Sequence, residues 1–277
     1  MALKSGHVYL LLRGLLRGFV HGAPMTCGAI ILAAGRGERM RPLTDSCPKP
    51  LLQVHGKALM QWPMEALVRA GVSELMINTA WLGEQIATYF GDRFDPHAGG
   101  AQADKSVDTG SVRMHYSDEG LDFGGALETA GGIVRVLPRM SDPFWVLAGD
   151  VFVPEFVFSP EAVERFRAST MLAHIWLVPN PPHNAKGDFG LMDGAPVTND
   201  GAARFTYSTI GLYRHALFAP PYCAIAAGNP DGIRAPLAPI LRLAIDHGLV
   251  SGEIYTGPWV DVGTPERLAR LNLSTES

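Results

Sequence analysis

The sequence predicts an α/β fold in which a mostly parallel sheet is covered by helices on both faces. From Cys27 onward, short β-like runs alternate with segments of helical periodicity, which is the pattern of such a sheet. The runs have the composition of buried strands. At 277 residues, with 47% hydrophobic and 18% charged residues, the chain can bury a substantial core, and we expect one domain over residues 25–277.

Residues 1–24 precede this pattern, and we expect them to be a leader outside the fold. They are apolar, but Arg13 and Arg17 interrupt the stretch where a signal peptide has its apolar segment, and no clean small-residue cleavage site follows. The run is also too short and too charged to span a bilayer. Met25 lies just ahead of the first strand, which favours a poorly ordered extension or a misassigned start over a docked amphipathic helix or true targeting.

The elements of the domain follow from periodicity and from turn residues. Helical spacing begins at Leu59 and ends at Gly71, for example, and residues 73–78 then form a short apolar run. Residues 95–111 are polar and glycine-rich, which predicts a surface loop, and residues 179–200 are turn-rich, which predicts hairpins beside the active site. The expected strands are 29–34, 73–78, 112–117, 144–150, 170–178 and 209–214. The expected helices are 59–70, 82–91, 126–138, 236–248 and, after the stretch 253–263, a last one from Thr264.

Charge and cysteine content exclude several classes of function. A formal net charge of -4 and a pI near 6.1 give no basic footprint for DNA or RNA, so a bound polyanion should be small and held locally. Three cysteines without a C-x-x-C spacing argue against a disulfide framework and a zinc site. We therefore expect a cytoplasmic protein with no nucleic-acid or membrane partner, and the oligomeric state stays open.

The stretch GRGERMRPLTDSCPKP, residues 35–50, follows the first strand and differs from the two familiar phosphate-binding motifs. The dinucleotide fingerprint requires a third glycine at position 40, which is Met40. The phosphate loop of nucleotide hydrolases requires G-K-[ST], which does not follow the glycines. Both of these readings are excluded.

The same stretch nevertheless has the chemistry of a phosphate site. Gly35 and Gly37 lack a Cβ, so their backbone N–H groups can approach phosphate oxygens, and Arg39 and Arg41 add permanent positive charge. Lys49 lies between two prolines, which restrict its backbone and suit a cation that is held in place. We expect a nucleotide phosphate site here rather than a solvated basic turn.

Two aspartates are candidates for a metal site. Asp150 ends the apolar run FWVLAGD, and Asp261 lies in PWVDVG. A carboxylate at the carboxyl edge of a parallel sheet points into the crevice where ligands bind, and two of them can hold a hard divalent ion that also takes phosphate oxygens. Either aspartate alone is more often a turn or cap residue.

Residues 32–50 closely resemble the signature LAAGxGxRxxPLTxxxPKP of the sugar-phosphate nucleotidylyltransferases. The resemblance continues through ETAGG at 128–132, the aspartate of LAGD, GDFG at 187–190 and WVDVGT at 259–264. It implies a Rossmann-like α/β/α sandwich around a mixed, mainly parallel sheet. The nucleotide is then bound by the N-terminal half and the sugar by the C-terminal half.

The resemblance also implies a mechanism and its residues. A sugar 1-phosphate oxygen attacks the α-phosphorus of a nucleoside triphosphate, so no base is required and catalysis is positioning plus charge neutralisation. Arg39 is expected to hold the triphosphate, Lys49 the α-phosphate and the attacking phosphate, and the aspartate pair Mg²⁺. The implied nucleotide-binding residues are Ala33, Ala34, Gly35, Gly37, Asn78 and Gly131; the implied sugar-binding residues are Glu128, Asp188 and Ser208; the implied metal ligands are Asp150 and Asp261.

Within the superfamily the sequence is most similar to the N-acetylmuramate 1-phosphate uridylyltransferases of bacterial cell-wall recycling. The stretches INTAWLGEQI, LETAGGI and VSGEIYTGPWVDVGTPERL carry that similarity. A few additional residues before Glu128 and the long 95–111 loop depart from the family pattern beside the base site. Two alternatives stay open: a mannose-1-phosphate guanylyltransferase, and an inactive sugar-nucleotide-binding regulatory protein, which intact Lys49, Asp150 and Asp261 argue against.

Overall fold

The computed structural model describes residues 27–96, 111–192, 196–201 and 203–274. The predicted leader and most of the predicted 95–111 loop lie outside these residues. Within them, no helix is both long and apolar enough to cross a membrane.

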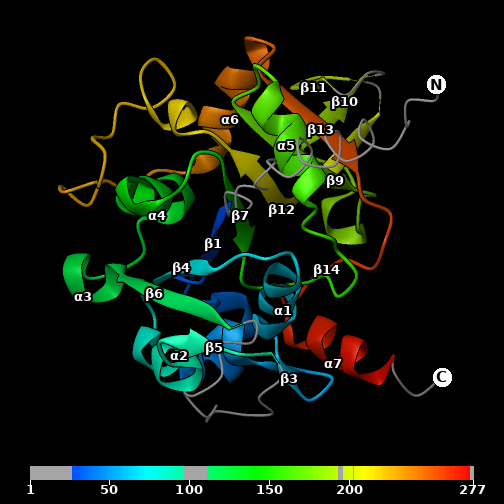
Figure 1. The fold of residues 1–277 in the computed structure, drawn as a ribbon. Helices are drawn as coiled ribbons and strands as arrows, with labels where there is room; N and C mark the ends of the chain where they lie inside the picture. Colours follow the sequence, from blue (N-terminus) through cyan, green and yellow to red (C-terminus); the bar gives the residue numbers. More distant parts are fainter. Residues whose placement is uncertain (1–26, 97–110, 193–195, 202, 275–277) are drawn as a thin grey trace, which may run out of the picture.

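The central feature is a mixed sheet whose middle strands are parallel (Figure 1). Strand β1 pairs in parallel with β4 on one side and β7 on the other, and β6 continues beyond β4. Strand β12 runs antiparallel to β7 and connects the hairpin β10–β11 and the pair β9–β13 to the sheet. The strands are β1 Gly28–Leu32, β2 Gln53–Val54, β3 Lys57–Ala58, β4 Glu74–Thr79, β5 Arg93–Phe94, β6 Val112–Asp118, β7 Phe144–Ala148, β8 Val151–Phe152, β9 Ala173–Val178, β10 Phe189–Leu191, β11 Val197–Thr198, β12 Arg204–Tyr213, β13 Val250–Ile254 and β14 Val260–Asp261.

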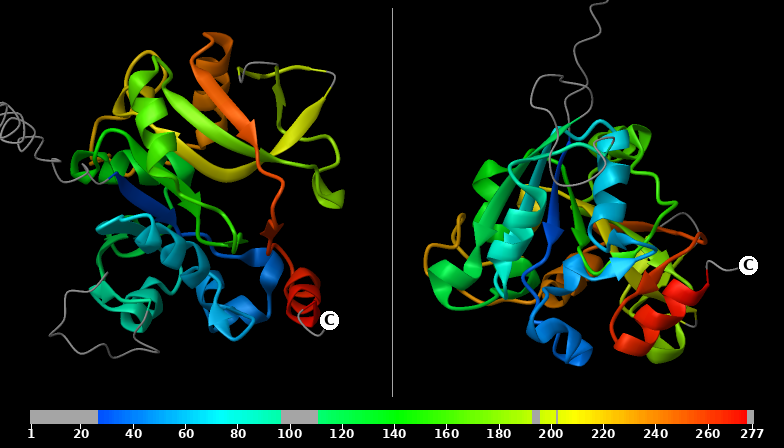
Figure 2. Two further views of the ribbon diagram at one scale, coloured as in Figure 1. Left: turned by 45° about the vertical axis from the view of Figure 1, so that its right-hand side comes forward. Right: turned by 90° about the horizontal axis from the view of Figure 1, so that it is seen from below.

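Helices cover both faces of this sheet (Figure 2), and the alternation of side chains along the strands explains why. Ile31 of β1 points into a core shared with α1, α2 and α5, whereas Ile30 points into a second core shared with α4 and α6. The predicted α/β fold class is therefore confirmed. The helices are α1 Gln61–Arg69, α2 Gly83–Phe90, α3 Glu119–Phe123, α4 Glu128–Val136, α5 Pro160–Ala168, α6 Leu237–Asp246 and α7 Pro265–Leu273.

A third, smaller core joins the two ends of the domain. Met40 and Leu52 of the glycine-rich segment pack with Val262 and Leu268, which come from the end of the chain. Figure 1 shows the consequence, because α7 lies at the same end of the molecule as the hairpin β2–β3. This packing fixes Asp261 and α7 beside the segment that follows β1.

Most predicted elements are present, and the departures have local explanations. Helix α5 was not expected, although Ser159 accepts a hydrogen bond from Ala162 N and Pro160 occupies the first turn, which is a strong start signal. The short helix α3 begins at Asp118, which caps it in the same way. The stretch 253–263, to which no element was assigned, contributes the end of β13 and all of β14.

Candidate active site

A cavity of about 790 Å³ opens where the parallel strands end. Leu32 and Ala148, the last residues of β1 and β7, line it, as expected for the ligand crevice of an open α/β sheet. Two walls come from different parts of the chain. The loop wall consists of residues 33–35, 37–40, 49, 50 and 78, and the strand wall consists of Asp188, Phe189, Tyr207, Thr209 and the α6 residues Leu237, Ala238, Leu241 and Arg242.

The glycine-rich turn of the loop wall has room for a ligand. Gly37 has φ 69, in the left-handed region, and a Cβ there would lie 3.0 Å from Thr44 Cγ2. Thr44 Oγ1 donates to Gly37 O at 2.8 Å, which fixes the turn. At Gly35, by contrast, a Cβ would meet no atom within 4 Å, so this glycine leaves open space in the cavity.

The arginines of this turn fall into two groups. Arg36 and Arg41 form ion pairs with Asp45 at 3.0 and 3.1 Å, so they hold the turn together. Arg39 is exposed and lines the cavity. The position predicted to bind the triphosphate therefore faces the cavity, while its neighbours stabilise the loop.

Lys49 lies on the cavity beside two carboxylates. Its side chain is almost buried, and Nζ lies 2.5 Å from Asp150 Oδ2 and 4.0 Å from Asp261 Oδ1. The aspartates are far apart in sequence but meet because Asp261 of β14 pairs with Val151 of β8, the residue after Asp150. Asp150 lines the cavity, and Asp261 adjoins it, next to the lining residue Gly263.

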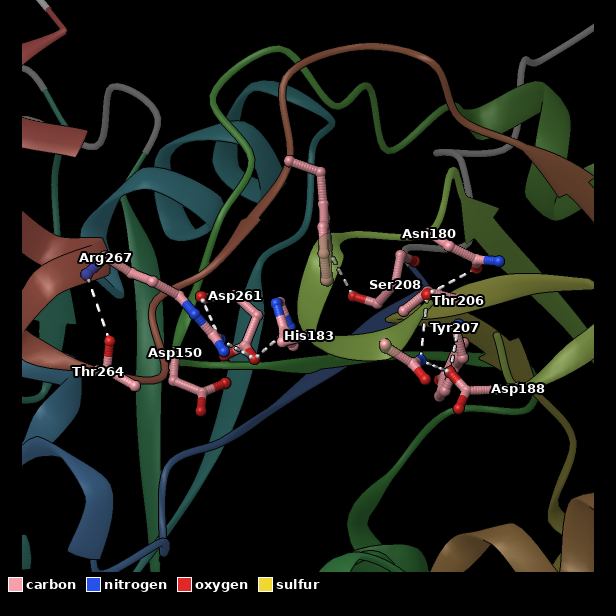
Figure 3. Close-up of polar contacts among 12 residues, drawn as sticks. Asp150, Asn180, His183, Asp188, Thr206, Tyr207, Ser208, Asp261, Thr264 and Arg267 are labelled. Carbon is pink, nitrogen blue, oxygen red and sulfur yellow. Dashed lines mark hydrogen bonds and ion pairs between the residues drawn. The ribbon is translucent and has the colours of Figure 1, made fainter. Parts of the chain in front are cut away.

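The side chains of Arg267 and His183 contact Asp261 and hold it in place (Figure 3). Arg267 Nη1 donates to Asp261 Oδ2 at 2.9 Å and to its carbonyl oxygen at 3.2 Å, and His183 Nε2 lies 3.3 Å from the same carboxylate oxygen. Thr264 accepts from Arg267 N and caps α7, so the arginine projects from a defined helix start. These contacts fix the direction in which Asp261 presents its other oxygen.

A metal at this position would depend on ligands from the substrate. Across the described ranges, no group of three or more histidine, cysteine, aspartate or glutamate side chains is arranged to hold an ion. Asp150 and Asp261 nevertheless direct carboxylate oxygens at one ammonium group, Lys49 Nζ, so the pair can surround a cation. Hard divalent ions complete such a set with water and phosphate oxygens.

A buried hydrogen-bond chain supports the far end of the loop wall. Asn78, only 3% exposed, accepts from Ala33 N at 2.8 Å and donates to Glu119 Oε1 at 2.8 Å. Glu119 is fully buried, and its other oxygen accepts from Leu127 N at 2.7 Å. Burial raises the pKa of the Glu119 carboxyl, and these two hydrogen bonds oppose the rise. The chain thus ties the residue after β1 to the segment that begins α4.

Two residues on the cavity adopt a backbone conformation that is unusual for their type. Glu128 has φ 60 and Thr209 has φ 69, and both line the cavity. Such conformations cost energy outside glycine and cluster at ligand sites. Among the described residues, the buried hydroxyl oxygen of Thr209 has no hydrogen-bond partner. We therefore regard Thr209 as a ligand-facing residue that the sequence reasoning missed.

Asp188 anchors the strand wall. Its Oδ2 accepts from Tyr207 N at 2.8 Å and from Asn184 Nδ2 at 3.2 Å, as Figure 3 shows for the first of these contacts. Thr206, on the same strand as Tyr207, donates to the side-chain oxygen of Asn180 at 3.0 Å. The wall is therefore built from side chains that bond to one another across β12 and the turn before β10.

Comparison with known proteins agrees with this geometry. Residues 28–277 match the family model described as nucleotidyl transferase. The N-acetylmuramate alpha-1-phosphate uridylyltransferase of Neisseria meningitidis is 43% identical, over 87% of this chain and 94% of that protein. The protein of the same description from Caulobacter vibrioides is 32% identical, over 86% of this chain and 92% of its own length.

The chain belongs to the nucleotidyl transferase family.

The fold agrees with that membership and with the resemblance identified in the sequence. A crystal structure described as a putative glucose-1-phosphate thymidylyltransferase from Bacillus anthracis superimposes with a TM-score of 0.66, covering 90% of this chain and 95% of that one at 19% identity. At that identity the likeness concerns the fold alone. The nucleotidyl transferase fold predicted from the sequence is confirmed.

The structure of this nucleotidyl transferase places most of the predicted site residues on one cavity. Asp261 adjoins the cavity, as described above. The predicted residues that line it are Ala33, Ala34, Gly35, Gly37, Arg39, Lys49, Asn78, Glu128, Asp150 and Asp188.

Two predicted residues lie elsewhere. Gly131 is inside α4, where a Cβ would be 2.5 Å from Ile233 O, so it allows close packing of the helix against the following loop. Ser208 is fully buried and donates to Trp176 O at 2.7 Å. The neighbouring residues Tyr207 and Thr209 line the cavity instead, as the alternation of side chains along a strand predicts.

Proposed function

We propose that this nucleotidyl transferase transfers the uridylyl group of UTP to N-acetylmuramate α-1-phosphate, releasing pyrophosphate and forming UDP-N-acetylmuramate. The observation that carries the chemistry is the buried ammonium of Lys49, placed beside Asp150 and Asp261 on a cavity whose other border is a glycine-rich turn. The sugar and the base are supported by the 43% identity to the Neisseria meningitidis uridylyltransferase, which extends over 94% of that protein.

The reaction needs charge neutralisation more than proton transfer. A phosphate oxygen of the sugar 1-phosphate forms a bond to the α-phosphorus of UTP, and the bond from that phosphorus to the bridging oxygen of pyrophosphate breaks. The attacking oxygen is already an anion, so no base is required. Lys49 and Arg39 supply positive charge where phosphate oxygens converge, and Gly35 and Gly37 let the backbone approach them.

Asp150 and Asp261 fit a magnesium ion by their chemistry, since both direct a carboxylate oxygen at a single cationic group. When bound there, Mg²⁺ would neutralise the developing charge on the phosphates. The residues of the chain prepare this site: Arg267 and His183 orient Asp261, and β8 places Asp150 beside it.

The proposal extends to the biological context. The product is a nucleotide-activated cell-wall sugar, so we assign the enzyme to the recycling of peptidoglycan sugars in the cytoplasm. Asn78 and Thr129 line the cavity and are proposed to contact the base and ribose, and Glu128, Asp188 and Thr209 are proposed to contact the sugar.

The test is pyrophosphate release by the purified protein with Mg²⁺, crossing UTP, GTP, CTP and dTTP with the 1-phosphates of N-acetylmuramate, mannose and glucose. A dominant rate with UTP and the muramate compound is expected. Preference for GTP and mannose 1-phosphate would replace the proposal with the guanylyltransferase alternative. Tight nucleotide binding without turnover in any combination would instead indicate a regulatory protein.

A further inference from the structure

The strand wall contains a cation that the phosphate chemistry does not use. Among the described residues, three basic side chains line the cavity: Arg39 and Lys49 on the loop wall, and Arg242 of α6 on the strand wall. Arg39 and Lys49 lie in the segment that follows β1, where the phosphates are proposed to bind. Arg242 lies instead with Asp188 and Phe189.

The guanidinium of Arg242 is held in place by neutral groups. It lies over the ring of Phe189, with Cζ 4.9 Å from the centroid. Nη1 donates to the side-chain oxygen of Asn199 at 3.2 Å, and Nη2 lies 3.5 Å from the backbone carbonyl of Asp188. Asn199 in turn donates to Arg242 O at 2.9 Å, so the arginine and its helix are braced from both ends.

The charge of Arg242 has no carboxylate partner in the part of the chain that the structure describes. The carboxylate of Asp188 is turned away, toward Tyr207 N and Asn184, and Arg242 approaches only its carbonyl. Arg36 and Arg267, in contrast, each contact an aspartate carboxylate at about 3 Å. A half-buried, oriented guanidinium with neutral partners can accept an anionic ligand at little cost in reorganisation.

The proposed substrate carries such an anion. N-acetylmuramate differs from N-acetylglucosamine by a lactyl ether on O3, whose carboxylate is a second negative charge separate from the phosphate on C1. We infer that Arg242 binds this lactyl carboxylate and selects N-acetylmuramate 1-phosphate over sugar phosphates that lack it. This inference rests on the proposed function and identifies the residue that distinguishes the proposed substrate from other sugar phosphates.

The test compares one variant with two substrates. Arg242→Met keeps an unbranched apolar side chain over Phe189 and removes the charge. The ratio of kcat/KM for N-acetylmuramate 1-phosphate to that for N-acetylglucosamine 1-phosphate should fall about 10- to 100-fold, which corresponds to one lost hydrogen-bonded charge contact. The loss should appear in KM for the muramate compound. If the glucosamine compound turns over too slowly, its inhibition constant takes the place of its KM.

A matched control is available on the same wall. Arg204 Nη2 donates to the same Asp188 carbonyl at 2.6 Å, but Arg204 does not line the cavity. Arg204→Met should lower the melting temperature and leave the selectivity ratio as in the wild type. If Arg242 only supports the wall, Arg242→Met will behave in the same way, and the inference is wrong.

A second variant covers the case in which Arg242→Met does not fold. Arg242→Lys retains the charge but not the planar fork, so the selectivity ratio should fall by a smaller factor than in the methionine variant. A ratio equal to that of the wild type in every folded variant would overturn the inference. The wild-type enzyme tests the proposed function separately, since absence of turnover with N-acetylmuramate 1-phosphate would refute that function before any variant is made.

Discussion

The two walls of the cavity are built in different ways. The loop wall is largely one continuous segment, residues 33–50, in which two glycines and the cations Arg39 and Lys49 follow a single strand. The strand wall assembles Asp188, Thr209 and Arg242 from three elements, β10 and its preceding turn, β12 and α6. Phosphates are common to every nucleotide, so the wall proposed to bind them can be one compact motif, whereas the wall proposed to contact the sugar consists of side chains that can differ individually.

The largest expected effect is at the loop wall. Lys49→Ala should lower kcat by about 10³-fold or more, because it removes an oriented cation from the place where charge develops. Steady-state pyrophosphate release measures it, with circular dichroism to verify the fold. Lys57→Ala is the control. Lys57 Nζ forms a comparable ion pair with Glu65 at 2.8 Å, and neither residue lines the cavity. Near-normal turnover in the Lys49 variant would refute the assigned role.

The second-largest effect is expected at the two aspartates proposed to bind Mg²⁺, Asp150 and Asp261. Asp261→Asn keeps the shape of the side chain, so the hydrogen bond from Arg267 can persist while the charge is lost. We expect kcat to fall about 10²-fold and the magnesium concentration for half-maximal activity to rise. A titration of activity against MgCl₂ measures both. Activity that survives an excess of chelator would contradict a metal at Asp150 and Asp261.

The buried hydrogen-bond chain through Asn78 and Glu119 can be disrupted by one substitution and restored by a second. Asn78→Asp keeps the acceptor for Ala33 N but turns a second carboxylate toward Glu119 Oε1, so KM for the nucleotide should rise about tenfold. Adding Glu119→Gln restores a donor and acceptor in matching order and should recover most of the loss. A double variant no better than Asn78→Asp would show that the chain does not position the wall.

Alanine substitutions at two glycines should affect different properties, stability at Gly132 and nucleotide binding at Gly35. A Cβ at Gly132 would lie 2.5 Å from Glu119 Oε1, so Gly132→Ala should cost about 1–3 kcal/mol of stability. At Gly35 a Cβ meets nothing within 4 Å, so Gly35→Ala should fold with the wild-type melting temperature and raise KM for the nucleotide. Chemical denaturation and kinetics on both variants measure the contrast. The opposite pattern would mean that Gly35 has a packing role.

The smallest effect is expected on the strand wall. Ser208→Ala removes a buried hydrogen bond to Trp176 O and should cost about 1 kcal/mol of stability without changing KM for the sugar phosphate. Thr209→Val should leave stability nearly unchanged, since the buried hydroxyl has no hydrogen-bond partner among the described residues, and should raise that KM, because the residue lines the cavity. If Ser208→Ala changes KM more than Thr209→Val does, the sequence-based choice of Ser208 as the sugar contact holds after all.

The difference between the walls also explains which predicted residues lie together on the cavity. On the loop wall, Gly35, Gly37, Arg39 and Lys49 were predicted as a group and lie together, because residues a few positions apart cannot separate far in space. On the strand wall, Asp188 was predicted and lines the cavity, but Arg242 gave no signal. It belongs to the amphipathic helix α6, in which an arginine is indistinguishable by sequence from a solvated one.

The sequence by itself determined the α/β class, the glycine-rich cationic turn and the family, since periodicity, glycine sterics and permanent charge act over short stretches of chain. Tertiary structure decided which side chains meet. The pairing of β8 with β14 joins Asp150 to Asp261, and Thr209 rather than Ser208 lines the cavity. Strands β8 and β14 lie more than a hundred residues apart in the sequence, so no local pattern encodes their contact.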